Sequence, residues 1–376
     1  MKYYIVAGEP SGDLHGGNLI RGLAAADAEA QFRFWGGDKM AEAGGSENLV
    51  KHYRELSFFG IMHVLRNLRT IFAQLDECVK DIEQYQPDVV VLVDYPSFNM
   101  RIAKWAKSRG IKVFYYIPPK VWAWKEHRVK SLRKYVDRLY AIFPFEQGYF
   151  EGKGIKPVYF GNPLVDAIAN KCAVMPSREE FFKEYGLDER PVIALLAGSR
   201  KTEIAANLPD MIELSRRFAD YQFVVAGVSW LDASVYREVI GGADVKVVSD
   251  KTYELLSHAE AAIVTSGTAT LETALMNVPE IVVFRIPYLY EKLRPYVLKI
   301  PYVSLVNINL GSEVVREIIT SRFDADAVAE ELRSILPGGT RRESMLQEFA
   351  VLRRLMGEEG VARRAAADMV KTLKGE

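Results

Sequence analysis

The chain has 376 residues, enough for two domains of ordinary size, and its apolar content is sufficient to fill two cores. Acidic and basic residues balance at 49 each, which argues against a nucleic-acid-binding protein. The two cysteines, Cys78 and Cys172, are too few and too far apart for a zinc site or a disulfide scaffold. No apolar run approaches the ~20 residues that span a bilayer, and the first residues lack the pattern of a signal peptide, so we expect a cytoplasmic protein.

Short apolar runs alternate with helical patterns along most of the chain, which is typical of βαβ units and parallel sheets. A Pro-containing break at residues 171–177 separates two such series, and the pattern after residue 325 is helical. The sequence therefore predicts an α/β protein with domains at residues 1–168 and 169–338 and helices at 339–376. The predicted strands are residues 3–7, 32–35, 89–93, 113–117, 139–143 and 158–160, then 192–197, 223–226, 245–248, 262–265 and 281–284.

The first predicted strand is followed by a glycine-rich turn, Gly-Glu-Pro-Ser-Gly-Asp at residues 8–13. Glycines there let a ligand approach the backbone, but the spacing is not GxGxxG, so a dinucleotide site is not supported. Carboxylates in this turn suit sugar hydroxyls better than phosphates. The candidate sugar-binding residues are Glu9, Ser11, Gly12 and Asp13. Because Ser-Gly-Asp is also common in plain turns, a purely structural role stays open.

A segment rich in apolar residues and flanked by arginines follows at residues 58–72. Such a segment can lie in a membrane interface with its basic groups toward anionic headgroups, or it can be a buried helix that covers the sheet. The stretch 101–138, with twelve basic residues against two acidic ones and three tryptophans, favours the membrane hypothesis. The candidate membrane-facing residues are Phe58, Phe59, Met62, Val64, Leu65, Arg66 and Arg69.

Asp94 directly follows the most apolar run of the chain, residues 89–93. Such a strand should be central in the sheet, and ligands of open α/β sheets bind beyond the carboxyl ends of central strands. A partly desolvated carboxylate in that place can act as a general base on a hydroxyl group. The alternative is that Asp94 caps a helix beginning near Ser97.

In the second series, two turns are suited to anions. Gly198, Ser199 and Arg200 end its first strand, and the guanidinium could hold a diphosphate. A second turn precedes a short helix, and a carboxylate one helical turn further in, Glu272, could accept two ribose hydroxyls. The residues of this second turn are Ser266, Gly267 and Thr268. An ordinary capped helix remains the alternative, and neither turn is a Walker loop.

The sequence offers an Asp-Ala-Asp triplet at residues 324–326 that could be read as a metal-binding motif. The triplet opens a predicted helix, where carboxylates compensate the helix dipole. We therefore assign it to capping and expect no metal and no cofactor.

The motifs, taken in order, resemble those of the lipid-A-disaccharide synthase family. Single motifs would be weak, but the ordered set covers the chain from end to end. They lie at residues 7–13, 94–99, 121–124, 143–146, 198–200, 266–272 and 302–305. The resemblance implies a glycosyltransferase-B fold, with two Rossmann-like domains whose parallel sheets face a cleft and with C-terminal helices that return to the N-terminal domain. It also implies that the first domain takes the acceptor and faces the membrane, and that the second takes the UDP-sugar donor.

The family resemblance further implies a reaction of lipid A and lipopolysaccharide biosynthesis in a Gram-negative bacterium. UDP-2,3-diacylglucosamine would donate its sugar, with inversion, to the 6-hydroxyl of 2,3-diacylglucosamine 1-phosphate (lipid X). Asp94 would be the base, Arg200 with the 266–268 turn would receive the diphosphate, and Glu272 the ribose. Asn307 also keeps its place in the family pattern and would join the sugar-binding residues. The expected location is the cytoplasmic face of the inner membrane, in peripheral contact with anionic lipid.

The sequence departs from the family pattern at residues 161–163, where Gly-Asn-Pro replaces Gly-His-Pro, so any role for an imidazole there is in doubt. It leaves open whether the C-terminal helices also form a homodimer. The alternative functions are an enzyme like UDP-N-acetylglucosamine 2-epimerase, a transferase with a soluble acceptor, and a UDP-sugar-binding protein without catalysis.

Overall fold

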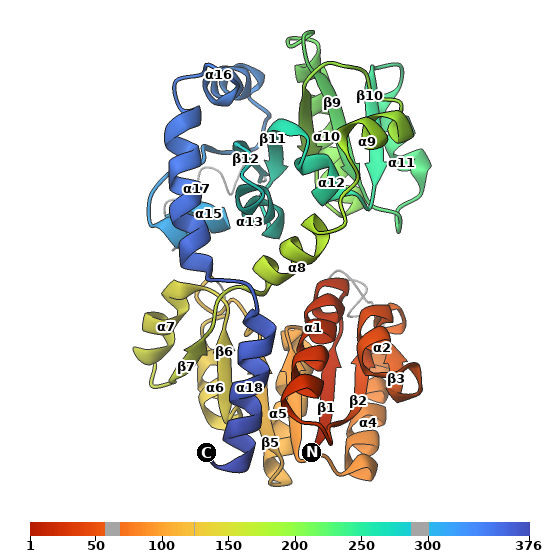
Figure 1. Cartoon of the computed structure of the whole chain (residues 1–376), viewed down its shortest axis with the longest axis vertical. Coiled ribbons are helices and arrows are strands. Elements are labelled where there is room, and N and C mark those ends of the chain that lie inside the picture. Colours follow the sequence, from red (N-terminus) through yellow and green to blue (C-terminus); the bar gives the residue numbers. More distant parts are fainter. Residues whose placement is uncertain (57–67, 124, 287–300) are drawn as a thin grey trace. The chain divides into compact units, whose positions relative to one another are not determined.

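The computed structural model describes residues 1–56, 68–123, 125–286 and 301–376, which fall into two units (Figure 1). Unit 1 comprises Met1–Ala167 and Met356–Glu376, and unit 2 comprises Ile168–Leu355. Each unit is built on a parallel sheet, so the predicted α/β class with two Rossmann-like domains is confirmed. Six of the candidate membrane-facing residues, from Phe58 to Arg66, lie outside the described residues.

Unit 1 contains a seven-stranded sheet in the order β3-β2-β1-β4-β5-β6-β7. Every neighbouring pair is parallel, and the strand order reverses between β1 and β4. This reversal is a topological switch point, where α/β proteins bind ligands. The strands are β1 (Lys2–Ala7), β2 (Gln31–Gly36), β3 (Leu49–His52), β4 (Val89–Val93), β5 (Lys112–Tyr116), β6 (Arg138–Ala141) and β7 (Pro157–Tyr159).

Helices bury both faces of the unit 1 sheet, so β4 is apolar throughout and fully buried. On one face lie α1 and α18, which approach each other closely because Gly22 of α1 has no side chain to meet Ala366. On the other face lie α4, α5 and α6. The helices are α1 (Pro10–Ala26), α2 (Asp38–Gly44), α4 (Leu68–Tyr85), α5 (Pro96–Ser108), α6 (Arg128–Tyr135), α7 (Pro144–Glu151) and α18 (Val361–Lys374), with α8 (Pro163–Cys172) running on into unit 2 and short 3₁₀ helices at Ser46–Asn48 and Tyr53–Glu55.

Unit 2 contains a six-stranded parallel sheet in the order β10-β9-β8-β11-β12-β13. Its strands are β8 (Val192–Leu196), β9 (Gln222–Gly227), β10 (Val245–Ser249), β11 (Ala259–Thr265), β12 (Glu280–Arg285) and β13 (Glu317–Thr320). Its helices are α9 (Arg178–Tyr185), α10 (Lys201–Ser215), α11 (Ala233–Ile240), α12 (Thr252–Leu256), α13 (Thr268–Leu275), α15 (Leu305–Leu310), α16 (Ala325–Ile335) and α17 (Arg342–Met356). As expected, the Asp-Ala-Asp triplet opens α16, where Asp324 accepts a hydrogen bond from the Ala327 N–H.

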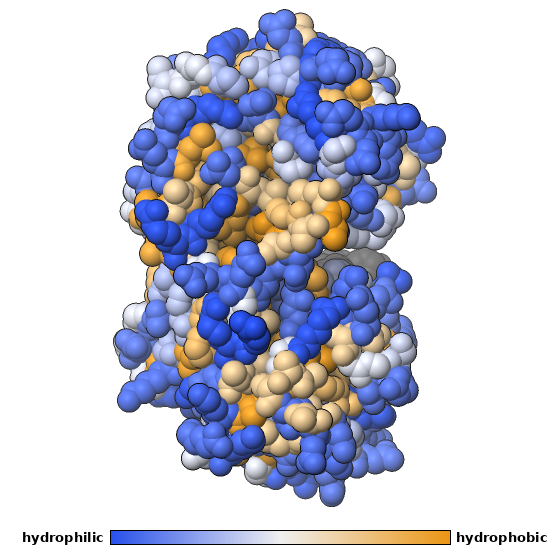
Figure 2. Space-filling model, in the orientation of Figure 1, coloured by the Kyte–Doolittle hydropathy of each residue, from blue (hydrophilic) through white to orange (hydrophobic). Residues whose placement is uncertain are grey.

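Hydrophilic side chains cover most of the surface drawn in Figure 2, with smaller apolar areas between them. Among the described residues, the exposed large apolar side chains are Phe72, Val174, Trp230 and Leu355. Each unit therefore buries most of its apolar surface in its own core.

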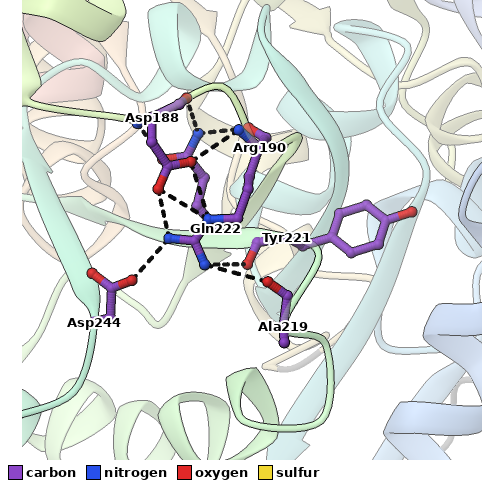
Figure 3. Close-up of polar contacts among 6 residues, drawn as sticks. All are labelled: Asp188, Arg190, Ala219, Tyr221, Gln222 and Asp244. Carbon is purple, nitrogen blue, oxygen red and sulfur yellow. Dashed lines mark hydrogen bonds and ion pairs between the residues drawn. The ribbon is translucent and has the colours of Figure 1, made fainter.

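The amino ends of β8, β9 and β10 are joined by a polar network around Arg190 (Figure 3). The guanidinium pairs with Asp188 at 2.6 Å and with Asp244 at 2.8 Å, and it donates to two backbone carbonyls. The Gln222 amide completes the network by donating to the carbonyls of Asp188 and Arg190. The groups that this network joins are thus paired within the protein, which is typical of a structural cluster.

Candidate active site

Asp94 lies at the carboxyl end of β4, beside the switch point of unit 1, and the backbone there is strained. Asp94 and Tyr95 have φ angles of 47° and 48°, in the left-handed region that residues other than glycine seldom adopt. The Asp94 carbonyl accepts hydrogen bonds of 2.8 Å from both the Asn99 amide and the Tyr115 hydroxyl. The fully buried Asn99 also donates to the carbonyls of Val6 and Val93, so it ties β1 and β4 to the strained turn.

The Asp94 carboxyl group is partly buried, and burial raises its pKa above the ordinary value for aspartate. The Lys120 ammonium and the Tyr95 N–H act in the opposite direction and favour the charged form. Helix α5 begins at Pro96 with Tyr95 at its N-cap, and within the described part of the chain no side chain caps it. The alternative role of Asp94 as a helix cap is therefore not supported, and the hypothesis that it is a general base is retained.

The turn after β1 packs directly on the turn after β4. A Cβ atom on Gly8 would lie 2.4 Å from the Tyr95 ring, so only glycine allows this contact. Gly12 packs less tightly, since a Cβ atom there would lie 3.3 Å from the Ala7 Cβ. The two motifs, distant in sequence, are thus brought together. Glu9 is half-exposed and Ser11 is exposed at this edge of the sheet.

Asp13 is buried, and its carboxylate accepts three backbone hydrogen bonds at the start of α2. The donors are the N–H groups of Gly37, Lys39 and Met40, at 2.7, 3.0 and 3.0 Å. Because both oxygens are occupied, we propose that Asp13 positions the start of α2. Glu9 and Ser11 remain the candidates for sugar binding.

A buried carboxylate without a role predicted from the sequence, Glu146, supports the loop after β5. Glu146 is fully buried and accepts hydrogen bonds from the Trp122 indole at 3.0 Å and from the N–H groups of Ile142 and Phe143. Burial raises the pKa of Glu146 to about 7. Through Trp122 it holds the loop that carries Lys120. The Phe-Pro-Phe-Glu motif at residues 143–146 could have indicated this role, because it places a glutamate three residues after a helix N-cap.

In unit 2, the turn at the start of α10 satisfies its own hydrogen-bond donors. The Glu203 carboxylate accepts from the Ser199 N–H at 3.0 Å and from the Arg200 N–H at 3.3 Å, and it pairs with the Arg200 guanidinium at 2.5 Å. Gly198 provides the positive φ that the turn requires. An anion would therefore meet Arg200 as an exposed side chain, not the backbone donors of this turn.

The start of α13 is different. Its N-cap is Gly267, not Ser266 or Thr268, and among the described residues no side chain caps it. The Ser266 hydroxyl donates instead to the Val303 carbonyl at 3.1 Å. Backbone N–H groups at an uncapped helix start can bind an anion, because the helix cannot satisfy them itself.

Glu272 lies one turn into α13 and accepts a 2.7 Å hydrogen bond from the Tyr253 hydroxyl of α12. Burial raises the pKa of Glu272, and this hydrogen bond opposes the shift. Tyr253 was not identified from the sequence, because its partner lies nineteen residues away. The pair forms an oriented carboxylate beside the uncapped helix start.

Asn307 is fully buried with its amide satisfied within the protein. It donates to Val315 and Glu317 and accepts from the N–H groups of Val314 and Val315. Glu317 in turn accepts from the Val303 N–H. We therefore propose that Asn307 positions the loop that holds Ser266, and does not contact sugar.

Asn162 replaces the histidine of the family pattern and has a local role. Its side chain donates to the Ile142 carbonyl and accepts from the Leu164 N–H, both at 3.0 Å. These contacts fix the start of α8, and the side chain is almost fully buried. Asn162 therefore acts as a helix cap.

Arg69, the one described member of the membrane-facing set, is exposed on α4. On the same helix, Phe72 is 47% exposed, and the Arg101 guanidinium lies 4.8 Å from its ring centroid. No helix in the described part of the chain is long and apolar enough to cross a bilayer. The described residues also contain no cluster of three or more His, Cys, Asp or Glu side chains that could hold a metal ion.

Comparisons with known proteins agree over nearly the whole chain. The family model described as lipid-A-disaccharide synthetase matches residues 3–369. Lipid-A-disaccharide synthases from Syntrophus aciditrophicus and Myxococcus xanthus are each 35% identical, over 98% and 99% of this chain and 97% of their own lengths.

Two solved structures show the same fold. A UDP-GlcNAc 2-epimerase from Neisseria meningitidis bound to UDP-GlcNAc has a TM-score of 0.65 at 14% identity, with both chains fully covered. Anabaena Alr3699/HepE in complex with UDP and glucose has a TM-score of 0.62 at 11% identity and covers 99% of this chain and 100% of its own. At such low identity these two matches establish the fold alone.

Proposed function

The chain belongs to the lipid-A-disaccharide synthase family, and on that premise we propose that it transfers 2,3-diacylglucosamine from UDP-2,3-diacylglucosamine to the 6-hydroxyl of 2,3-diacylglucosamine 1-phosphate. The products are a β-1′,6-linked disaccharide and UDP. The observation that carries the assignment is the match of residues 3–369 to this one family. A similar fold in an epimerase does not argue for epimerase activity at 14% identity.

Asp94 is the residue we assign to the chemical step. Its carboxylate takes the proton of the acceptor 6-hydroxyl, the oxygen attacks the anomeric carbon of the donor, and the bond to the diphosphate breaks with its electron pair leaving on UDP. A single displacement inverts the anomeric centre and needs only one base. Support comes from the partly buried carboxyl group with its raised pKa, on a turn held by Asn99 and Tyr115.

The donor diphosphate is assigned to the start of α13, with the Arg200 guanidinium as its counter-charge. The uncapped N–H groups near Gly267 support the first assignment, and the exposed position of Arg200 supports the second. Glu272, oriented by Tyr253, accepts the ribose hydroxyls. Glu9 and Ser11 remain the candidates for sugar contacts in unit 1.

Both proposed substrates carry acyl chains, so we also propose peripheral contact with anionic membrane lipid. Exposed Phe72 and Arg69 and the basic stretch 101–138 support it. Flotation with anionic vesicles at low and high salt tests this contact, and failure to bind at any salt concentration would remove it. Light scattering in solution decides whether the chain also forms a homodimer, for which the C-terminal helices are the candidate interface.

The reaction is tested by mass spectrometry after the purified protein is mixed with both substrates in detergent micelles containing EDTA. We expect a tetraacyl disaccharide phosphate in the wild type and only traces with Asp94→Asn. If the wild type formed no disaccharide, with or without added metal, the named acceptor would be wrong. Soluble sugars would then be screened for transfer or epimerisation.

A further inference from the structure

Trp230 is an exposed aromatic side chain at the carboxyl edge of the unit 2 sheet. It lies in the loop between β9 and α11, directly after the strand ends at Gly227. Its side chain is 62% exposed, and it is the only tryptophan in the sequence of unit 2. Of the exposed large apolar side chains in the described part of unit 2, namely Val174, Trp230 and Leu355, it alone is aromatic.

The loop around Trp230 is held in place by three hydrogen bonds to other elements. The Val228 N–H donates to the Tyr236 hydroxyl, and the Ser229 N–H donates to Asp250, both at 3.0 Å. The indole N–H donates to the Ser199 carbonyl at 3.2 Å. An isolated exposed apolar residue is ordinary, but here the ring is fixed while much of its surface faces solvent. A ring held in this way loses little conformational entropy when a flat ligand packs on it.

The strand order defines what lies on either side of this ring. In the sheet, β9 is between β10 and β8. Residue Tyr253, the partner of Glu272, follows β10, and the turn with Ser199 follows β8. The Trp230 loop therefore follows the strand between those that lead to Tyr253 and to Arg200, whereas Glu272 follows β11, on the far side of β8. Because Tyr253 contacts Glu272, a nucleotide whose ribose is bound by Glu272 can direct its base toward these loops.

We propose that the Trp230 indole is the stacking surface for the base of the nucleotide donor. This inference rests on the proposed function and extends it, because it names the residue that contacts the uracil ring. Stacking uses the π-face that every base has, so Trp230 supplies affinity, and hydrogen-bonding groups elsewhere select uracil. The sheet edge is thereby divided into contacts to phosphate, to ribose and to base.

The test is calorimetric titration of the full-length protein with UDP and, separately, with inorganic pyrophosphate. Trp230→Ala should weaken UDP binding about tenfold, and Trp230→Phe, which keeps an aromatic ring, about twofold. Pyrophosphate has no base, so its affinity should not change in either variant. Val174→Ala, which removes another exposed apolar side chain of unit 2, is the matched control and should bind both ligands like the wild type.

Tryptophan emission gives an independent readout that does not require the alanine variant to fold. UDP should quench the wild-type emission, and Trp230→Phe should abolish that quenching. The inference is overturned if Trp230→Ala binds UDP as tightly as the wild type, if UDP and pyrophosphate weaken equally, or if quenching persists without Trp230. If the wild type itself did not bind UDP, the proposed function would fail, and the inference with it.

Discussion

The carboxyl edges of the two sheets are built differently. In unit 1, the edge presents a carboxyl group with a raised pKa on a strained turn, held by Asn99 and Tyr115. In unit 2, the edge presents an uncapped helix start and an oriented carboxylate, Glu272. A strained turn with a basic group suits proton transfer, whereas open N–H donors suit binding of a charged ligand. We propose on this comparison that unit 1 supplies the chemistry and unit 2 holds the nucleotide.

The largest expected effect separates chemistry from binding. Asp94→Asn removes the base without changing the size of the side chain, so kcat should fall by about 10²- to 10⁴-fold. UDP affinity, measured by calorimetry, should stay unchanged, because the nucleotide is assigned to unit 2. Asp88→Asn, at the other end of β4, is the control and should retain most of the activity. A variant at Asp94 with wild-type turnover would show that another group is the base.

A variant at the proposed ribose site, Glu272→Gln, should instead weaken nucleotide binding. Glu272→Gln replaces a charged acceptor with a neutral amide, which should weaken UDP binding about thirtyfold. Tyr253→Phe, which only removes the hydroxyl that orients Glu272, should weaken it about threefold. Calorimetric titration with UDP measures both. If Tyr253→Phe were as damaging as Glu272→Gln, the tyrosine would contact the nucleotide directly.

Away from the carboxyl edge, polar groups should matter for stability alone. Glu280 begins β12, is fully buried, and neither of its carboxyl oxygens has a partner among the described residues. Burial raises the pKa of Glu280 well above the ordinary value and so favours its neutral form. Glu280→Met removes this unsatisfied group and should raise the free energy of unfolding by about 1–2 kcal/mol at pH 7. UDP binding should not change.

The pH dependence of the Glu280 effect has a defined sign. The pKa of Glu280 is higher in the folded state than in the unfolded state. Burial of the carboxyl group therefore costs least below about pH 4, the unfolded pKa, where the group is neutral in both states. The cost grows as the pH rises toward the folded pKa. The stability gap between Glu280→Met and the wild type should therefore widen from pH 5 to pH 8 in chemical unfolding experiments. A gap independent of pH would mean that Glu280 is charged in the folded state.

The smallest expected effect is on the acid limb of the profile of kcat/KM against pH. A base must be deprotonated, so kcat/KM should fall as the pH decreases through the pKa of Asp94. The Lys120 ammonium lowers that pKa, so Lys120→Met should move the limb to higher pH by up to about one unit. Lys130→Met, on α6, is the control and should leave the limb in place. A shift to lower pH would contradict the assigned electrostatics.

Much of the fold could be predicted from apolar runs and turn residues. The strands that were missed, β3 and β13, are short and lie at sheet edges with mostly half-buried residues, so their sequences carry little hydrophobic pattern. The buried central strands, by contrast, are continuous apolar runs such as β4.

The candidate site was harder to predict, because residue type does not reveal partners. Asp13 and Asn307 lie in motifs of the candidate site, yet their polar side-chain atoms are hydrogen-bonded to other parts of the protein. The donors at Ser199 are taken by Glu203, which is local in sequence and could have been recognised as a capping pair. The link from Tyr253 to Glu272 depends on how α12 packs, which no sequence pattern encodes.

The most direct test of this division of labour is amide hydrogen exchange with and without saturating UDP. The account predicts that exchange slows in peptides covering residues 266–272, because the diphosphate takes up the free N–H groups near Gly267. Unchanged exchange in those peptides, under conditions where calorimetry shows UDP to be bound, would contradict the placement of the nucleotide at α13.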